Sequence, residues 1–111
     1  MDSRFIDVRV NGDSMWPTLE DGNIARFEKI LSDNLHKGQI VLVEHPLRND
    51  FYLIKRISSV HGDKIFLVGD NPDPNASEDS HNFGFVKSSK VLAVLTGNSL
   101  SLIHISEPTR P

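Results

Sequence analysis

Short apolar runs recur along the whole chain, and none of them follows the 3.6-residue period of a helix. Between Phe5 and Val10 apolar residues alternate with charged ones, which is typical of a half-buried strand. Turn residues separate similar runs, which predict further strands at 24–27, 39–45, 51–60, 65–68 and 91–95. The pattern therefore predicts a mainly β fold, either a small folded-over sheet or a partly open barrel.

The segments between these runs differ in character. The run at 39–45 is rich in β-branched residues and ends at Pro46, so we expect a central strand there. Residues 61–64 predict a hairpin turn. Residues 31–37 are polar and allow about one helical turn, whereas 69–83 predict a long polar loop.

A serine follows the first predicted strand, in the segment GDSMWPTL at 12–19. Gly12 begins a turn, and bulky apolar residues flank Pro17. The hydroxyl of Ser14 would then be open on one side and supported on the other, as an attacking nucleophile requires. The alternative is a strand-to-turn corner in which Ser14 bonds its own backbone, and for an isolated Gly-x-Ser that is the commoner case.

Lys55 lies in an otherwise apolar run. A period of two places it on one face with Phe51, Leu53 and Ile57, while Arg56 faces the other side, toward solvent or a carboxylate. Burial disfavours the ammonium form, and a neutral amine can accept the proton of a serine hydroxyl. The alternative is a lysine whose stem covers apolar surface while its amine reaches water.

The loop at 69–84 is dense in turn formers and small hydroxyl residues, and long loops in compact domains are often functional. A calcium loop is disfavoured because the central glycine and terminal glutamate of an EF-hand are missing. His36, His45, His61 and His81 lack the spacing of metal ligands. We expect neither a metal nor another cofactor.

Composition limits the class of protein. With 111 residues, 38% hydrophobic and 24% charged, the chain has room for one soluble domain. Twelve basic and fifteen acidic residues give a net charge of -3 without a basic stripe, which disfavours a nucleic-acid partner. The absence of cysteine excludes disulfides, and the charged N-terminal segment fits neither a signal peptide nor a membrane anchor. We therefore expect a cytoplasmic protein.

The C-terminal segment stands apart. Residues 100–110 look like the translation of a transposase adapter used to prepare sequencing libraries, and eleven matching residues are too many for coincidence. We assign 1–99 to a single domain and 100–111 to a foreign tail outside the fold, with the natural C-terminus missing after about Ser99. A natural tail is the alternative.

Three segments together resemble the signal peptidase I superfamily, the serine–lysine proteases that include the LexA-like self-cleaving repressors. They are VNGDSMWPTL at 10–19 for the nucleophile, YLIKR at 52–56 for the base, and GDN at 69–71 with SEDS at 77–80 for the closing loop. The chain looks most like the nickel-type superoxide dismutase maturation proteases, because it is small, has no insertion between base and closing loop, and carries QIVLVEHP at 39–46. The resemblance spans nearly all of 8–97 and implies the small folded sheet of that superfamily.

The resemblance implies specific roles. Ser14 would be the nucleophile, Lys55 the general base, and Ser77 the residue that orients the lysine amine. Gly12 offers no hydroxyl two positions before the nucleophile, so the oxyanion hole would rest on backbone N–H groups near Gly12, Ser14 and Met15.

Five residues of the closing loop would support the site: Asp70, Asn71, Asp79, Ser80 and His81. The family usually has arginine where His81 stands, paired with the aspartate at Asp79. A permanent ion pair therefore becomes one that depends on pH.

These features predict a serine endopeptidase that removes an N-terminal extension from a partner protein. The substrate would bind as an extended strand, against the segment before Ser14 on one side and near 51–55 on the other. The resemblance implies a nickel superoxide dismutase precursor as substrate, with no metal needed by the protease itself.

Two alternatives stay open. One is a signal peptidase I catalytic domain without its anchor, although Met1 lies too close to Val8 for an anchor to fit unless the reading frame is also truncated at that end. The other is a LexA-like self-cleaving regulator or an inactive peptide-binding relic. A regulator should carry an Ala-Gly or Cys-Gly cleavage site and an upstream DNA-binding domain, and the sequence has neither.

Overall fold

The computed structural model of the protein describes residues 4–30, 34–73, 75, 76 and 78–97. In this part of the chain seven antiparallel strands form one sheet in the order β1-β2-β7-β3-β4-β5-β6. The strands are β1 (Phe5–Arg9), β2 (Ile24–Lys29), β3 (Ile40–Glu44), β4 (Tyr52–His61), β5 (Lys64–Val68), β6 (Val86–Lys87) and β7 (Val91–Gly97). A four-residue helix, α1 (Ser80–Phe83), and a 3-10 turn, η2 (Ser88–Lys90), lie between β5 and β7.

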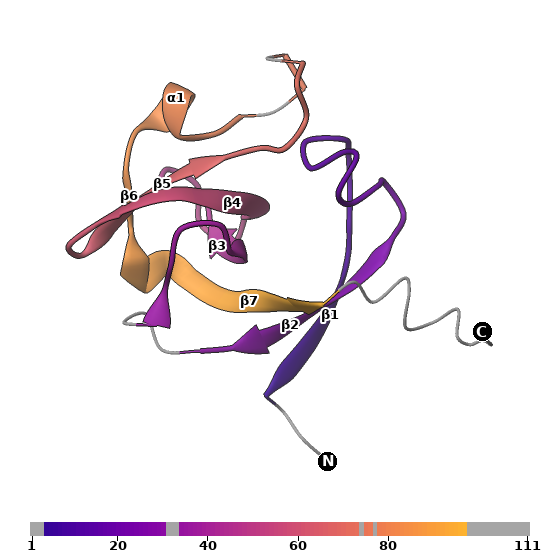
Figure 1. Ribbon diagram of the computed structural model, residues 1–111, viewed down its shortest axis with the longest axis horizontal. Helices are drawn as coiled ribbons and strands as arrows, with labels where there is room; N and C mark the ends of the chain where they lie inside the picture. Colours follow the sequence, from indigo (N-terminus) through magenta and orange to yellow (C-terminus); the bar gives the residue numbers. More distant parts are fainter. Residues whose placement is uncertain (1–3, 31–33, 74, 77, 98–111) are drawn as a thin grey trace.

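The sheet curls into a half-barrel (Figure 1). β7 pairs with both β2 and β3 and so joins the two halves, while β1 and β6 stand at opposite ends of the strand order. The register shifts at 26/27, 42/43 and 57/59, and such bulges bend a strand and increase its twist. The mainly β, partly open barrel predicted from the sequence is confirmed.

β3 lies between two hydrophobic clusters. Its alternate residues point to opposite faces, so Leu42 joins one cluster and Val43 the other. The first cluster includes Met15, Leu19 and Phe27, and the second is centred on β-strand residues such as Ile57. The prediction of a central strand is correct, because β3 is buried on both sides.

The predicted strands shift by one or two residues, with one consequence for the site. β4 begins at Tyr52, so Phe51 lies before the strand and is 41% exposed. Phe51 still lines the same cleft as Leu53 and Lys55, as expected for one face, but the prediction that it is buried there was wrong. Ile57, in contrast, is fully buried with Lys55 on the same strand.

The predicted polar loop at 69–83 contains α1 at its end. Asp79 caps this helix: its side chain accepts from the N–H of His81, and the Asn82 side chain accepts from the Asp79 N–H. Hydrophobic periodicity cannot reveal a helix of one turn, nor a strand of two residues such as β6.

Two of the predictions about the fold lie wholly or partly outside the described residues. The tail at 100–111 lies there, as does the start of the helical turn expected at 31–37.

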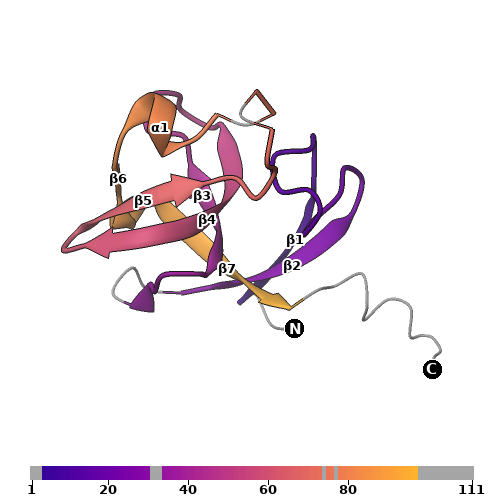
Figure 2. The same cartoon turned by 45° about the horizontal axis from the view of Figure 1, so that its top comes forward.

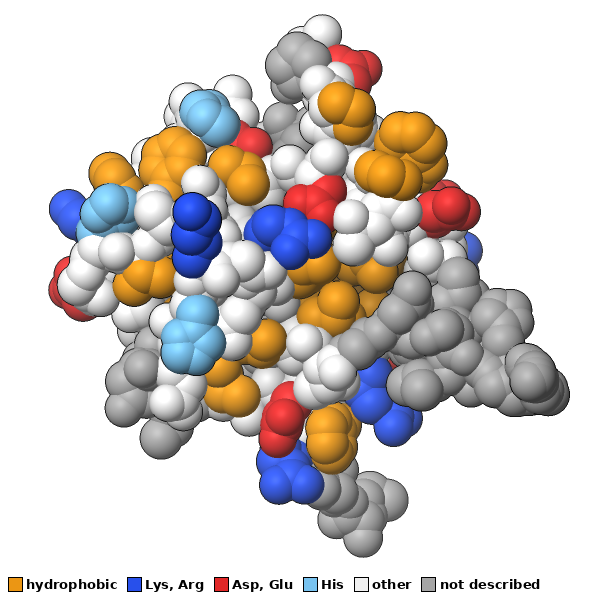
Figure 3. Space-filling view, in the orientation of Figure 1, with side chains coloured by type: hydrophobic (Ala, Val, Ile, Leu, Met, Phe, Trp, Pro, Cys, Tyr) orange, Lys and Arg blue, Asp and Glu red, His pale blue; other side chains and the backbone are white. Residues whose placement is uncertain are grey.

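On the face shown in Figure 3, hydrophobic side chains lie in small groups between polar and charged ones. No helix in the described part of the chain is long and apolar enough to cross a membrane.

Candidate active site

The loop after β1 carries Ser14 on a firm support. Met15 and Leu19, on its C-terminal side, are buried in the first hydrophobic cluster. Gly12 has a φ of +90°, a conformation that favours glycine, and its N–H donates to Asp21 Oδ1 at 2.7 Å. Ser14 is half-buried next to these anchors. Its hydroxyl is thus held near the surface by residues that cannot easily move.

Lys55 lies in β4 and is only 2% exposed. Its partner across the β3–β4 pair is Val41, which is fully buried. Burial lowers the pKa of Lys55 from its ordinary value of 10.5, while the negative charges of Asp79 and Glu78 raise it and oppose that effect. A lysine that reaches water with its amine does not fit this exposure.

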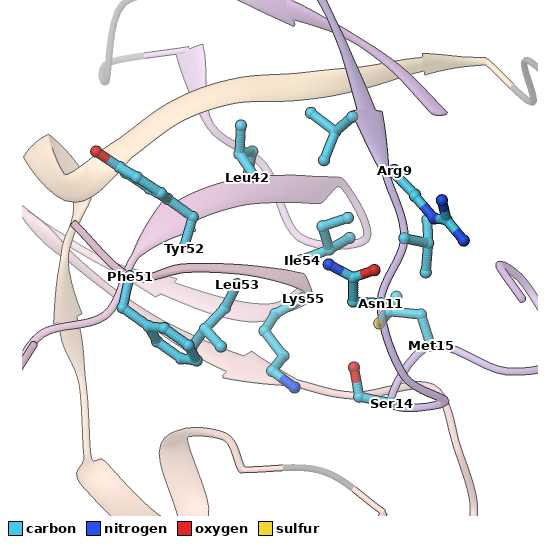
Figure 4. Close-up of a pocket in the computed structure, with 12 residues that line it drawn as sticks. Arg9, Asn11, Ser14, Met15, Leu42, Phe51, Tyr52, Leu53, Ile54 and Lys55 are labelled. Atoms are coloured by element: carbon cyan, nitrogen blue, oxygen red, sulfur yellow. The ribbon is translucent and has the colours of Figure 1, made fainter. Parts of the chain in front are cut away.

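Ser14 and Lys55 lie on the same cleft, which has a volume of about 400 Å³. Figure 4 shows the Lys55 amine and the Ser14 hydroxyl pointing toward one another, one from β4 and the other from the loop after β1. The lining of the cleft is mainly apolar and includes Val8, Met15, Leu42, Leu53 and Ile54. An amine of lowered pKa that faces a hydroxyl is suited to remove its proton.

The loop after β5 holds the nucleophile loop in place. The Asn71 N–H donates to the Ser14 carbonyl at 3.0 Å, and Asn71 Nδ2 donates to the Asp13 carbonyl at 2.8 Å. The two loops lie side by side in Figures 1 and 2. Asn71 therefore holds the two peptide groups that flank Ser14.

Asp70 ties the same two loops to β4. Arg56, next to Lys55, donates from Nε and Nη2 to the two oxygens of Asp70 at 2.8 and 2.7 Å. Thr18 Oγ1 donates to Asp70 Oδ2 at 2.6 Å, and Arg56 Nη1 donates to the Gly38 carbonyl at 2.7 Å. The hydrogen bonds from Arg56, supported by Thr18, hold the pKa of Asp70 below its ordinary value. One carboxylate thus connects the nucleophile loop to the strand of Lys55.

Asp79 and Ser80 fix the far end of the closing loop. Asp79 Oδ2 accepts from the Gly69 N–H at 3.3 Å, and Ser80 Oγ accepts from the Leu67 N–H at 2.8 Å. Ser80 is 3% exposed, so this hydroxyl is committed to β5. The start of α1 is thereby fastened to the strand that pairs with β4.

A family model described as signal peptidase, peptidase S26, matches residues 3–71, which is more than half of the 111-residue chain. The chain belongs to the signal peptidase S26 family. The match covers Ser14, Lys55, Asp70 and Asn71 and ends before Asp79. No curated protein matches the chain. Membership of the family shows that this is a signal-peptidase-like peptidase.

Other residues expected at the site of this S26 peptidase lie as follows. Ser77 is outside the described residues, so its role toward Lys55 stays a prediction. The Met15 side chain is buried in the core and its carbonyl accepts from the Leu19 N–H. Because the Gly12 N–H already donates to Asp21, of these two residues the Met15 backbone N–H is the one that could contribute to an oxyanion hole.

His81 lies on the outer side of α1, with a side chain that is 70% exposed. Its Nδ1 is 3.0 Å from Asp79 Oδ1, and its ring meets the edge of Phe66 at 5.1 Å between centroids. The backbone N–H of His81 also donates to Asp79. The His81 side chain thus adds a second contact to Asp79, which already caps α1.

We expect His81→Arg to keep or raise peptidase activity at pH 8, because arginine stays charged where an imidazole loses its proton. His81→Ala keeps the backbone bond to Asp79 and should lose at most about fivefold, since exposed ion pairs are worth up to about 1 kcal/mol. The measurement is the cleavage rate of both variants at pH 6 and pH 8. Equal rates for the two variants at both pH values would show that His81 does not brace the loop.

Three residues near the site of this peptidase were not identified from the sequence alone. Thr18 bonds Asp70, Glu78 acts on Lys55 by its charge, and His45 contacts Glu78. Thr18 lies within the nucleophile segment, so its position was a signal. His45 and Glu78 lie within the segments at 39–46 and 77–80, but their contact had no signal, because 33 residues separate them along the chain.

In the described residues, no group of three or more histidine, cysteine, aspartate or glutamate side chains is placed to bind a metal ion. The carboxylates nearest the cleft have other hydrogen-bond partners. Asp70 is bound by Arg56 and Thr18, and Asp79 caps α1.

Proposed function

We propose that this S26 peptidase is a serine endopeptidase with Ser14 as nucleophile and Lys55 as general base. The observation that carries the proposal is the burial of Lys55, at 2% exposure, with its amine directed at the Ser14 hydroxyl across the cleft (Figure 4). Burial of a lysine costs free energy, because its charge is removed from water. A lysine kept at such a position is therefore better explained by a chemical task than by packing.

Each step of the reaction uses groups of the chain and the substrate. The neutral Lys55 amine takes the proton of the Ser14 hydroxyl as its oxygen attacks the scissile carbonyl carbon. The tetrahedral intermediate then loses the amine product, which receives its proton from the Lys55 ammonium. This leaves an ester on Ser14. Lys55 next deprotonates a water molecule that attacks the ester, which releases the carboxylate product and restores Ser14.

Backbone N–H groups of the nucleophile loop would stabilise the oxyanion of the tetrahedral intermediate. Gly12 has no side chain to contribute a donor, and the Met15 side chain is buried. The hydrogen bonds that Asn71 donates to this loop and that Asp70 accepts from Thr18 hold the loop still, so its N–H groups need little reorganisation during the reaction.

The substrate would bind as an extended strand. β1 is the first strand of the sheet order and pairs with β2 alone among the described strands, so its other edge can accept a partner. The cleft between the end of β1 and the start of β4 is mainly apolar. Uncharged side chains next to the scissile bond would fit it best, because a charge there would be desolvated.

The proposed substrate is the precursor of a nickel superoxide dismutase, from which the enzyme would remove an N-terminal extension. The support is family membership together with the resemblance of 39–46 and of the three site segments to the maturation proteases of that enzyme. Processing of this kind would take place in the cytoplasm.

The test is to incubate the purified protein with recombinant nickel superoxide dismutase precursor and to follow the mass of the precursor. We expect one cut that frees a new N-terminus, and no cut with Ser14→Ala. An exported precursor with a signal peptide serves as the comparison substrate. If it is cut and the dismutase precursor is not, the substrate assignment is wrong and the anchorless signal peptidase alternative is correct.

A further inference from the structure

His45 is a buried titratable residue that the proposed reaction does not use. It follows β3 directly and is 3% exposed. Its ring lies between Phe51 and Phe83, at 5.8 and 5.1 Å between centroids. A polar ring in an apolar slot needs hydrogen-bond partners, because an unsatisfied buried group costs about 1–3 kcal/mol.

The partners of His45 assign its tautomer. The Leu47 N–H donates to Nδ1 at 3.0 Å, so Nδ1 is the acceptor and Nε2 carries the proton. Nε2 lies 3.3 Å from Glu78 Oε1 and donates to that carboxylate. The side chain of Glu78 is 52% exposed, so the buried imidazole is the fixed end of this bond.

Glu78 lies close enough to Lys55 for its charge to act on the amine. The carboxylates of Asp79 and Glu78 both raise the pKa of Lys55, against the larger effect of burial. Asp79 is held by the cap of α1, but Glu78 precedes that helix. The hydrogen bond between His45 and Glu78 thus connects the end of β3 to a negative charge that acts on the Lys55 amine.

The other charged groups around these residues have partners of their own. His81 pairs with Asp79, Arg56 pairs with Asp70, and Lys90 Nζ bonds Glu44 Oε1 beside His45. The ion pairs of these groups do not involve His45, whereas Glu78 contacts it directly.

We propose that His45 is a positioning residue, which anchors the Glu78 carboxylate within electrostatic range of the Lys55 amine and so adjusts the pH range in which Lys55 acts as a base. This inference rests on the proposed function, because it assigns a task to the surroundings of Lys55. Without the anchor, the half-exposed Glu78 side chain would turn toward water and its effect on the amine would fade.

The test is to follow the Lys55 amine by NMR in protein labelled at the lysine side-chain carbons, with Lys55→Met to assign its signal. Glu78→Gln removes the charge and should move the Lys55 titration to lower pH. His45→Asn keeps an acceptor for the Leu47 N–H but not the donor to Glu78, and should produce most of the same shift. His45→Gln places a donor near the former Nε2 position and is the matched control, expected to titrate as the wild type does.

The double variant His45→Asn/Glu78→Gln should shift no further than Glu78→Gln alone, because both changes remove one effect. A Lys55 titration that is unchanged in His45→Asn, moves to higher pH, or shifts additively in the double variant would overturn the proposal. Glu78→Gln, on a half-exposed side chain, tests the charge even if the His45 variants fail to fold, and an unshifted titration there also overturns it.

The pH profile of cleavage separates this proposal from the proposed function. Where Lys55 is the base, the rising limb of the profile should move to lower pH in parallel with the NMR titration. If the titration shifts as expected but Lys55→Met cleaves normally, the dyad is wrong and the link from His45 to Lys55 stands. If cleavage requires Lys55 but its titration ignores both variants, the dyad stands and the role of His45 is wrong.

Discussion

Lys55→Met should reduce cleavage of the precursor at least about a hundredfold, because removal of a general base costs on the order of a hundredfold or more. Methionine fills a similar volume in the same apolar site, so packing around Val41 and Ile57 should survive. The measurement is the single-turnover cleavage rate by mass spectrometry.

The same variant should be at least as stable as the wild type at neutral pH. Burial lowers the folded-state pKa of Lys55 below 10.5, so between these two values the unfolded chain binds more protons than the folded one. The stability of the wild type therefore rises with pH across this interval, relative to a variant without the amine. Denaturant titrations at pH 6 and pH 9 should show the advantage of methionine shrinking as pH rises.

Lys64→Met is the matched control. Lys64 begins β5 as an exposed residue, and its amine lies 5.2 Å from the centre of the Phe85 ring. Its loss should leave cleavage within about twofold, as expected for a surface change away from the cleft. Cleavage by Lys55→Met above about a hundredth of the wild-type rate would contradict the dyad.

The strands of this fold could be predicted because their pattern is local. The alternation at 5–10 and the β-branched run at 39–45 each reflect which faces are buried, and the structure places β1 and β3 there. The curl of the sheet could not be predicted in the same way. It depends on bulges such as that at Leu42/Val43 and on β7, which comes last in the chain but inserts between β2 and β3 in the sheet.

Part of the candidate site was also within reach of the sequence. Ser14 and Lys55 were chosen by context together with the family resemblance, and the apolar neighbours of Lys55 allowed either the burial that is observed or an amine that reaches water. The contacts of His45 with Glu78 and of Thr18 with Asp70 arise only when loops far apart in the chain meet. No period or spacing encodes such contacts, because they depend on how the sheet closes.

The packing of the loops explains why supporting residues can matter as much as those that react. Asn71 bonds the carbonyl of Ser14, and Asp70 bonds both Thr18 and the neighbour of Lys55 on β4. The nucleophile and the base come from separate segments, so their relative position depends on this third segment. Displacement of a reacting group by about 1 Å can cost about a hundredfold in rate.

Asp70→Asn should therefore weaken both stability and activity. The carboxylate accepts two charge-assisted hydrogen bonds from Arg56 and one short hydrogen bond from Thr18. An amide can replace only part of them. Charged hydrogen bonds are worth about 1.5–3 kcal/mol, and Arg56 is one-third exposed, so we expect a loss of about 2 kcal/mol in unfolding free energy. Cleavage should fall about tenfold or more, mainly in kcat, as the nucleophile loop loses its tie to β4.

The pH dependence of this loss identifies its cause. The folded-state pKa of Asp70 is lowered, so its contribution is present above the ordinary carboxyl pKa of 3.8 and is lost as pH falls through the lower folded value. The stability gap between wild type and Asp70→Asn should thus be constant from pH 5 to 8 and close in acid. Asp7→Asn is the control, because Asp7 binds Arg26 with the same geometry on the exposed surface of β1 and β2. An Asp70→Asn protein that unfolds and cleaves like Asp7→Asn would show that the carboxylate does not hold the site together.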